Sequence, residues 1–307
     1  NRLSSKLGFL TNIGLKMPLT KLVAKAILGV HPNRSLPELA SETLPRWFKS
    51  RTRPDVSKVT RGTVALFNDT FMNYNYPQIG RAAVELLEAA GFQVELANVT
   101  IDGDADMGCC GRPMISKGLL GEAAEAARKM VDLLYTFAQR DIPIIGFEPS
   151  CLLTFRDEYP ELVPGEKSRK VAQQSYLIDE FLIMLQEKGE LDVEFSDLPK
   201  QILFHGHCHQ KASIGTASSI AALRLPPGYQ VELVNAGCCG MAGSFGFEKE
   251  HYDISMQIGG QVLFPAVNAK GQEWEVAVTG VSCRQQVEDG TGRQARHLVE
   301  VLRDALA

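Results

Sequence analysis

The feature that most constrains this chain is a motif that occurs twice. Gly-Cys-Cys-Gly stands at residues 108–111 and again at 237–240 of the 307 residues. Each copy follows a short apolar run, a stretch of helical period and a second apolar run. Each is followed by another helical stretch and an apolar run that ends in Ser-Cys, at 150–151 and at 282–283. Such self-similarity predicts two similar structural units in tandem.

The apolar patterns predict the elements of each unit. The first copy should have strands at 63–67, 92–97 and 142–147 and helices at 79–90 and 117–140. The second should have strands at 201–204, 229–234 and 275–279 and helices at 218–225 and 248–268. Short β-branched strands that alternate with helices are typical of parallel sheets covered by helices. We therefore expect an α/β fold of two similar halves related by an approximate twofold axis, with an N-terminal helical arm.

The expected organisation has four parts. They are a basic helical arm at 1–60, a first repeat at 61–165, a helical connector at 166–198 and a second repeat at 199–307. The arm holds eleven Lys and Arg against three Asp and Glu, spread among apolar residues. This favours packing against an acidic surface, either of this chain or of a partner domain. The chain begins at Asn1 without a signal-peptide pattern, and we expect either a piece of a longer protein or a separate subunit.

Composition excludes several classes of protein. With 45% hydrophobic and 22% charged residues, the chain is neither disordered nor collagen-like. Its apolar stretches are too short, or too interrupted by lysine, to cross a bilayer, so we expect no transmembrane segment, although peripheral membrane association stays open. The arm lacks the interleaved aromatic residues of a nucleic-acid platform, and no nucleic-acid partner is expected.

The seven cysteines indicate metal or redox chemistry in a reducing, cytoplasmic compartment. Four of them form two pairs of sequence neighbours, Cys109-Cys110 and Cys238-Cys239. A disulfide between sequence neighbours closes a strained ring. In the expected fold every cysteine lies just beyond the carboxyl end of a strand, where open α/β sheets bind ligands. Helix N-termini at this edge stabilise thiolates. We expect Gly111 and Gly240, which follow the pairs, to bring backbone N–H groups close to a cofactor.

The two copies differ in their number of ligands. The second contributes four cysteines, the usual complement for an iron–sulfur cluster: Cys208, Cys238, Cys239 and Cys283. The first contributes three, Cys109, Cys110 and Cys151, because Phe71 stands where the second copy has Cys208. Three thiolates could bind zinc with a fourth ligand, hold an incompletely ligated cluster, or be empty. Asp69, Glu148 and a water are the candidates for the fourth ligand.

The densest polar stretch is His205-Gly-His207-Cys208-His209-Gln-Lys211. If it is extended, the three histidines share one face and Cys208 points to the other. We predict catalytic roles for His207, His209 and Lys211, in moving protons with electrons, contacting substrate or offsetting cluster charge. His205 is predicted to hydrogen-bond the cofactor. The remaining histidines, His31, His251 and His297, lack such a context and are expected to be structural or surface residues.

Five segments together resemble the cysteine-rich CCG-domain family of iron–sulfur oxidoreductases. They are residues 108–118, 148–152, 206–211, 236–246 and 280–284. The resemblance covers about 61–307 and is greatest to the carboxyl-terminal part of fused FAD and iron–sulfur D-2-hydroxyacid dehydrogenases. It implies an electron-transfer module of a dehydrogenase of the lactate, glycolate or 2-hydroxyglutarate type.

That resemblance also implies cofactors and partners. The second repeat would hold a cluster, of 4Fe-4S type, and the first repeat zinc or a second cluster. FAD would lie only on an upstream portion outside these 307 residues, and ferredoxin-type domains or subunits would pass electrons from it. Single cysteines in the two Ser-Cys motifs, where the family's heterodisulfide reductases have C-x-x-C, argue against the five-cysteine noncubane clusters of those enzymes.

Two other functions remain open from the residues alone. One is a zinc-stabilised docking scaffold that transfers no electrons. The other is metal-free thiol–disulfide chemistry at the cysteine pairs. Iron and zinc analysis of anaerobically purified protein separates all three.

Overall fold

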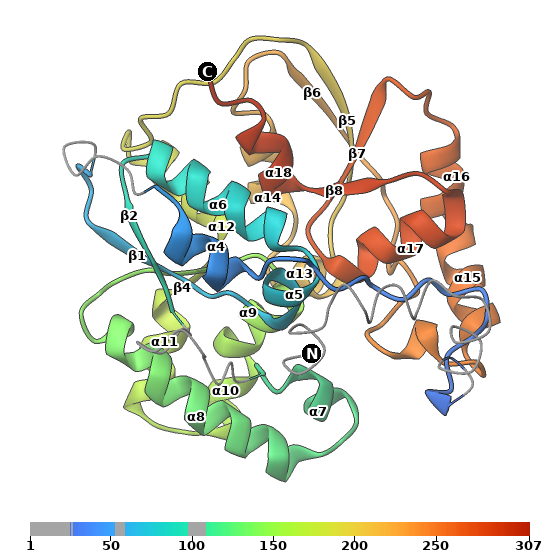
Figure 1. The fold of residues 1–307 in the computed structure, drawn as a ribbon, viewed down its shortest axis with the longest axis horizontal. Helices are drawn as coiled ribbons and strands as arrows, with labels where there is room; N and C mark the ends of the chain where they lie inside the picture. The colour runs from blue at the N-terminus through green and yellow to red at the C-terminus, as the bar shows by residue number, and fades with distance from the viewer. Residues whose placement is uncertain (1–24, 26, 53–58, 98–108) are drawn as a thin grey trace.

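The computed structural model describes residues 25, 27–52, 59–97 and 109–307, and Figure 1 shows the chain as a ribbon. The expected helical arm at 1–60 therefore lies partly outside the described residues. In its described part, α4 (Leu44–Ser50) packs on α6 (Pro77–Ala89), and Leu44 is completely buried. The approach is close, since a Cβ on Gly80 of α6 would overlap the Leu44 side chain.

Two four-stranded sheets of identical topology form the framework. The first contains β1 (Thr63–Leu66), β2 (Gln93–Leu96), β3 (Ile144–Gly146) and β4 (Ser175–Leu177) in the order β2-β1-β3-β4. The second contains β5 (Lys200–His205), β6 (Tyr229–Leu233), β7 (Trp274–Val278) and β8 (Ala295–His297) in the order β6-β5-β7-β8. All neighbours in both sheets pair in parallel. The predicted α/β fold with two similar halves is confirmed.

The helices connect and cover these strands. In the first half they are α5 (Thr70–Tyr74), α6, α7 (Arg112–Ser116), α8 (Leu120–Ala138), α9 (Pro149–Arg156), α10 (Glu158–Leu162), α11 (Glu166–Gln174) and α12 (Ile178–Glu187). In the second half they are α13 (Cys208–Ser213), α14 (Ala217–Leu223), the 3-10 turn η2 (Phe245–Phe247), α15 (Tyr252–Gln261), α16 (Leu263–Asn268), α17 (Val281–Thr291) and α18 (Leu298–Arg303).

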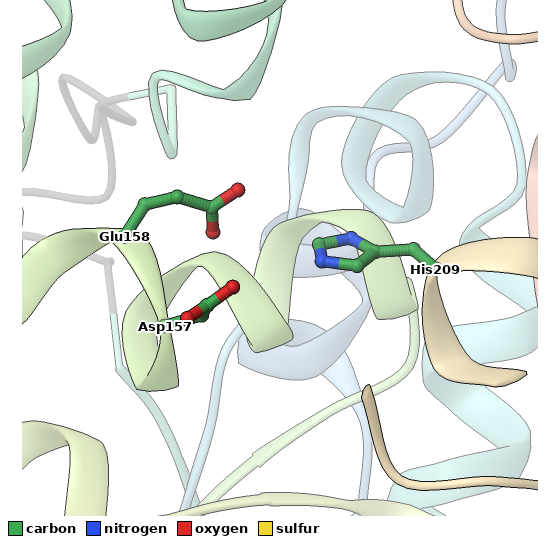
Figure 2. Close-up of side chains that lie close together, drawn as sticks. All are labelled: Asp157, Glu158 and His209. Carbon is green, nitrogen blue, oxygen red and sulfur yellow. The ribbon is translucent and has the colours of Figure 1, made fainter. Parts of the chain in front are cut away.

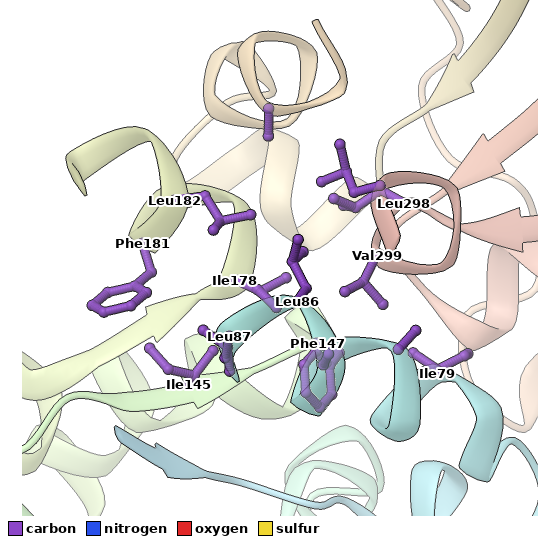
Figure 3. Packing of buried hydrophobic residues seen from close by; sticks show 14 of the residues in the cluster. Ile79, Leu86, Leu87, Ile145, Phe147, Ile178, Phe181, Leu182, Leu298 and Val299 are labelled. Carbon is purple, nitrogen blue, oxygen red and sulfur yellow. The ribbon is translucent and has the colours of Figure 1, made fainter. Parts of the chain in front are cut away.

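The largest hydrophobic core lies between the two sheets. There α6 packs on α18 and α12 packs on α14, so each half contributes two helices. Figure 3 shows Ile79 and Leu86 of α6 beside Leu298 and Val299 of α18. Smaller cores lie on the outer faces, under α8 and α11 in the first half and under α16 and α17 in the second. The halves therefore share one core, and their strand ends are held in a fixed relation.

The structure corrects two expected elements. Residues 175–177, expected within a helical connector, form β4 and pair with β3 as β8 pairs with β7. The repeat is thus one strand and one helix longer than its cysteine motifs indicate. The single helix expected at 248–268 is divided into α15 and α16 at Val262, whose φ of −139° is not helical. Within the described residues, no helix combines the length and apolarity that a membrane crossing needs.

Candidate metal centre

The cysteines gather where strands end and helices begin. In the second half, Cys208 is the first residue of α13 after β5, and Cys283 is the third residue of α17 after β7. Cys238 and Cys239 follow β6 in an irregular loop. Because β5 lies between β6 and β7 in a parallel sheet, their carboxyl ends meet at one edge. The topology therefore brings all four thiols of this half together.

The four thiols form a chain of contacts. The sulfurs of Cys208 and Cys238 are 3.8 Å apart, Cys238 interacts with Cys239, and Cys239 interacts with Cys283. Cys239 and Cys283 are buried, whereas Cys208 and Cys238 are partly exposed. The site is therefore closed on the sheet side and open at Cys208 and Cys238.

The pKa values of the four cysteines are shifted in opposite directions. Hydrogen bonds from the Cys208 and Cys239 thiols lower the pKa of Cys238 to about 2. The hydrogen bond from Cys239 lowers the pKa of Cys283, although burial opposes this effect, and the neighbouring His205 imidazole lowers it further. The pKa values of Cys208 and Cys239 are raised, by the contact with Cys238 first and by burial as well. Raised and lowered pKa values therefore alternate along the chain of thiols, and a metal centre would bind all four as thiolates in place of their remaining protons.

Backbone groups around Gly240 complete the site. The Gly240 N–H donates to the Cys238 sulfur over 3.3 Å. Its φ is +94°, and a Cβ there would overlap the carbonyl oxygen of Ser255. Lys211 Nζ donates to the carbonyls of Ala236 and Gly237, the latter over 2.5 Å, and thereby holds the loop that leads to the cysteine pair. Only glycine fits at position 240.

The first half has a smaller cluster of three thiols. The Cys110 and Cys151 sulfurs are 3.0 Å apart, and Cys109 interacts with Cys110. The Tyr159 hydroxyl donates to the Cys110 carbonyl over 2.8 Å and fixes this backbone. The contact with Cys110, and then burial, raise the pKa of the Cys109 thiol. The N–H of Gly111, whose φ is +83°, donates to this thiol and lowers its pKa by a smaller amount. The structure thus gathers the three cysteines that the sequence assigned to this copy.

Asp69 is the acidic side chain beside this cluster. Its Oδ1 accepts from the Phe71 and Met72 N–H groups at the start of α5, over 2.8 and 3.2 Å. Its Oδ2 is buried and has no hydrogen-bond partner. Burial, followed by the nearby charge of Glu148, raises the pKa of Asp69 to about 7. Phe71, the counterpart of Cys208, has no ligand atom, and both oxygens of Glu148 accept hydrogen bonds, so the orphaned carboxylate oxygen of Asp69 is the better candidate for a fourth ligand.

The expected alternation of the three histidines is wrong. The strand ends at His205 and α13 begins at Cys208, so the histidines diverge. His205 is fully buried against Cys283. His207 caps α13, its Nδ1 accepting the His209 N–H over 3.2 Å, and its Nε2 lies 3.8 Å from Glu148 Oε1. The turn between strand and helix sends each ring in a different direction.

His209 lies where α13 of the second half meets α9 of the first, close to Asp157 and Glu158 (Figure 2). One ligand atom from each of the three lies within 4.8 Å of the others. Arg112, however, already forms an ion pair with Glu158, and burial and this guanidinium lower the pKa of His209. The Arg112 guanidinium therefore already supplies a positive charge beside these three side chains. We interpret them as part of an ion-pair network where the two halves meet.

Two residues matter more than the sequence indicated. His297, expected to be structural or at the surface, is buried, and its Nδ1 accepts the Val299 N–H over 3.2 Å. Its Nε2 lies 3.2 Å from the Thr279 carbonyl and 3.4 Å from that of Phe147, at the ends of β7 and β3. Glu148 accepts hydrogen bonds from both halves. Neither role has a local signal, because the partners that join the halves are more than a hundred residues away in sequence.

The residues fit a metal centre in the second half. Four thiols, of which Cys238 and Cys283 have lowered pKa values, meet in a partly buried site with a backbone N–H donor and a lysine beside them. Among the described residues, only Asp157, Glu158 and His209 have three ligand atoms mutually within 4.8 Å. The thiols therefore form an open chain, wider than the ~3.8 Å sulfur spacing that a single tetrahedral ion with ~2.3 Å bonds requires. This spacing suits a centre with several metal atoms.

Comparison with known proteins identifies one domain of the chain. Residues 64–156 match the family model of the CCG cysteine-rich domain. The chain carries a CCG domain. The CCG resemblance of the motifs is thereby confirmed, and the matched segment contains all three cysteines of the first half together with Asp69 and Glu148.

Three relatives show where such CCG chains occur. A subunit of the anaerobic glycerol-3-phosphate dehydrogenase of Escherichia coli K12 is 28% identical over 97% of this chain and 72% of that protein. The D-2-hydroxyglutarate dehydrogenase of the same organism is 28% identical over 95% of this chain but only 28% of its own length. Lactate utilization protein A of Halalkalibacterium halodurans is 29% identical over 59% of this chain and 72% of that protein. This chain is thus similar to a dehydrogenase subunit, to part of a second dehydrogenase and to a lactate utilization protein.

Proposed function

We propose that this chain is the iron–sulfur, electron-transfer part of a flavin-dependent dehydrogenase. The observation that carries the proposal is the meeting of four thiols, from Cys208, Cys238, Cys239 and Cys283, at one edge of the second sheet. Their number is that of an iron–sulfur cluster, and their open spacing suits several metal atoms better than one. The names of the relatives, two of which are dehydrogenases or their subunits, support the same role.

The chain's own residues would prepare this site in three ways. The Gly240 N–H donates to sulfur, and Lys211 places a positive charge beside the thiolates, which favours the more negative, reduced state of a centre. His205 shields and faces Cys283 at the buried end. When bound, a cluster supplies one-electron transfer. Electrons would enter and leave at the partly exposed side, near Cys208 and Cys238.

We propose a second metal in the first half. Cys109, Cys110 and Cys151 would bind zinc or a second cluster, with the free oxygen of Asp69 as fourth ligand; a single zinc ion would have to draw these ligands closer, because no three of them lie mutually within 4.8 Å. Thiol–disulfide chemistry suits these cysteines poorly, although two sulfurs are 3.0 Å apart. The pKa values of all three are raised, that of Cys151 to about 11, and a protonated thiol is a weak nucleophile.

The complete enzyme would oxidise a D-2-hydroxy acid at FAD, of the lactate, glycolate or 2-hydroxyglutarate type. Removing hydride from a hydroxy acid needs a two-electron acceptor, and this chain would take the electrons afterwards one at a time, through ferredoxin-type domains. The partners are therefore FAD-binding and ferredoxin-type domains or subunits, in the cytoplasm and at the inner face of the membrane. His207 and His209 lie beside acidic groups of the first half, where proton movement or partner contact would occur.

Iron content of anaerobically purified variants tests the proposal. Cys238→Ser should remove the iron and visible absorbance of the second site. Cys109→Ser, the same change at the equivalent position of the first copy, is the matched control and should retain them. Equal iron in the parent and Cys238→Ser would exclude the assignment, and zinc without iron in the parent would favour the scaffold.

Electron transfer requires a separate experiment. The isolated chain should oxidise no 2-hydroxy acid, whereas its visible absorbance should bleach when a flavin-bearing portion and a D-2-hydroxy acid are added under anaerobic conditions. Unchanged absorbance during turnover of the assembled enzyme would show that this chain lies outside the electron path.

A further inference from the structure

One buried carboxylate joins the two halves next to both cysteine sites. Glu148 is only 3% exposed, yet both of its oxygens are engaged. Oε1 accepts from the Ser150 hydroxyl over 2.7 Å and from the Ser150 N–H over 3.3 Å, within the first half. Oε2 accepts from the N–H of Val281 over 2.9 Å, in the second half. The carboxylate is therefore a hydrogen-bonded bridge between the repeats.

Each end of this bridge leads directly to a metal-binding cysteine. Ser150 is followed by Cys151, the third residue of α9, and Val281 begins α17, whose third residue is Cys283. The N-cap of α17 is Gly280, which offers no side chain, so Glu148 supplies the acceptor from the other repeat. The Glu148 carboxylate thus accepts hydrogen bonds from the first turns of two helices, α9 and α17, and each of these turns carries a cysteine.

A second cross-link lies immediately before the first. His297 Nε2 approaches the carbonyls of Phe147 and Thr279, which directly precede Glu148 and Gly280. The strand ends and the helix starts that follow them are therefore tied together at adjacent residues. Any shift of Cys151 with its turn would be transmitted to the turn that carries Cys283.

We propose that Glu148 is a positioning residue through which the first repeat holds the start of α17 and its Cys283 in place, so that the second site loses affinity for metal when the Glu148 bridge is broken. The inference rests on the proposed function only in that the cysteines bind metal. It assigns to a residue of the first repeat an effect on ligands of the second. In Glu148→Gln the amide can still accept from Ser150, but its NH₂ group would face the Val281 N–H.

The test uses Co²⁺ as the probe, because thiolate coordination gives it an intense near-ultraviolet absorption. All variants carry Cys151→Ser, which disables the first site, so that Co²⁺ binding reports on the second. Glu148→Gln in the full chain should weaken Co²⁺ binding about tenfold, the effect of losing one hydrogen bond to a buried charge. Ser150→Ala is the matched control: it removes a bond to the same carboxylate but leaves the bridge, and its Co²⁺ affinity should equal that of the parent.

A second variant removes the bridge from the other side. Val281→Pro deletes the donating N–H at the first position of α17, where proline is well tolerated and where α9 has Pro149. Gly280, with φ −135° and ψ 146°, has the extended backbone that a residue before proline adopts. This variant should show the same loss as Glu148→Gln, and the double variant no more than either one. If Glu148→Gln fails to fold by circular dichroism, Val281→Pro alone decides the question.

The outcomes separate this inference from the proposed function. Co²⁺ affinity unchanged in Val281→Pro, or losses that add in the double variant, would overturn the positioning role of Glu148. The parent protein could contain no iron and still bind Co²⁺ more weakly when the Glu148 bridge is broken. That result would contradict the electron-transfer role but leave the positioning role of Glu148 in place.

Discussion

Asp69 is the buried charge whose removal should have the largest measurable effect on the metal-free protein. Burial raises its pKa to about 7 from 3.8, so the folded chain binds this proton more tightly than the unfolded chain. Stability therefore falls as the pH rises from 3.8 toward 7 and stays reduced above that range. Asp69→Asn keeps an acceptor for the Phe71 and Met72 N–H groups and cannot ionise.

The size of the effect follows from the shift in pKa. At 1.36 kcal/mol per unit of pKa, the raised pKa of Asp69 lowers the free energy of unfolding by about 4 kcal/mol at pH 8 and by about 2 kcal/mol at pH 5. Asp69→Asn should therefore raise the free energy of unfolding by about these amounts at the two values of pH. Urea denaturation of chelator-treated, reduced protein measures both.

A bound metal should reverse the sign of this effect. If Asp69 is the fourth ligand of the first site, Asp69→Asn should weaken Zn²⁺ binding there while it stabilises the metal-free chain. Equal stability of the two proteins at both values of pH would refute the burial argument. Equal Zn²⁺ affinity would refute the ligand assignment alone.

Three further predictions follow from buried contacts. Gly240→Ala should abolish metal binding at the second site, because its Cβ would overlap Ser255, whereas Gly243→Ala, also at positive φ but with open space, should leave the metal content of the purified protein intact. Arg34→Ala should lower the free energy of unfolding by about 3 kcal/mol, since it leaves Asp289 and Gln286 without their buried partner, and limited proteolysis should then cleave the arm faster. Burial lowers the pKa of His297 from 6.5, so unfolding should become easier as the pH falls below 6.5; His297→Gln should flatten this part of the thermal-stability profile, and an unchanged profile would contradict it.

Most of the fold could be predicted from the sequence because each repeat consists of apolar strand runs, stretches of helical period and cysteine motifs that are recognisable locally. Strand periodicity around β5 and β7, together with cysteines that follow strand ends, predicted where Cys208 and Cys283 would lie. The strand β4 escaped prediction because its three residues, Ser175–Leu177, are shorter than any clear alternation. Its counterpart β8 lies in the second half, and comparison of the segments after each Ser-Cys would have been the signal.

The hydrogen bonds between the two halves could not be predicted in the same way. The bond from Val281 to Glu148 spans 133 residues, and that from His297 to Phe147 spans 150. Neither leaves a local pattern, since any buried N–H or carbonyl can take such a partner. The directions of His207 and His209 depend on where a strand gives way to a helix, and a boundary shifted by two residues changes both.

The central claim is that the four thiols of the second half hold an electron-accepting iron–sulfur centre. Electron paramagnetic resonance of the anaerobic protein during a reductive titration tests this most directly. We predict a paramagnetic signal that appears on one-electron reduction, persists in Cys109→Ser and is lost in Cys238→Ser. A protein that contains no iron and gives no signal at any potential, or a signal unchanged in Cys238→Ser, would contradict the account.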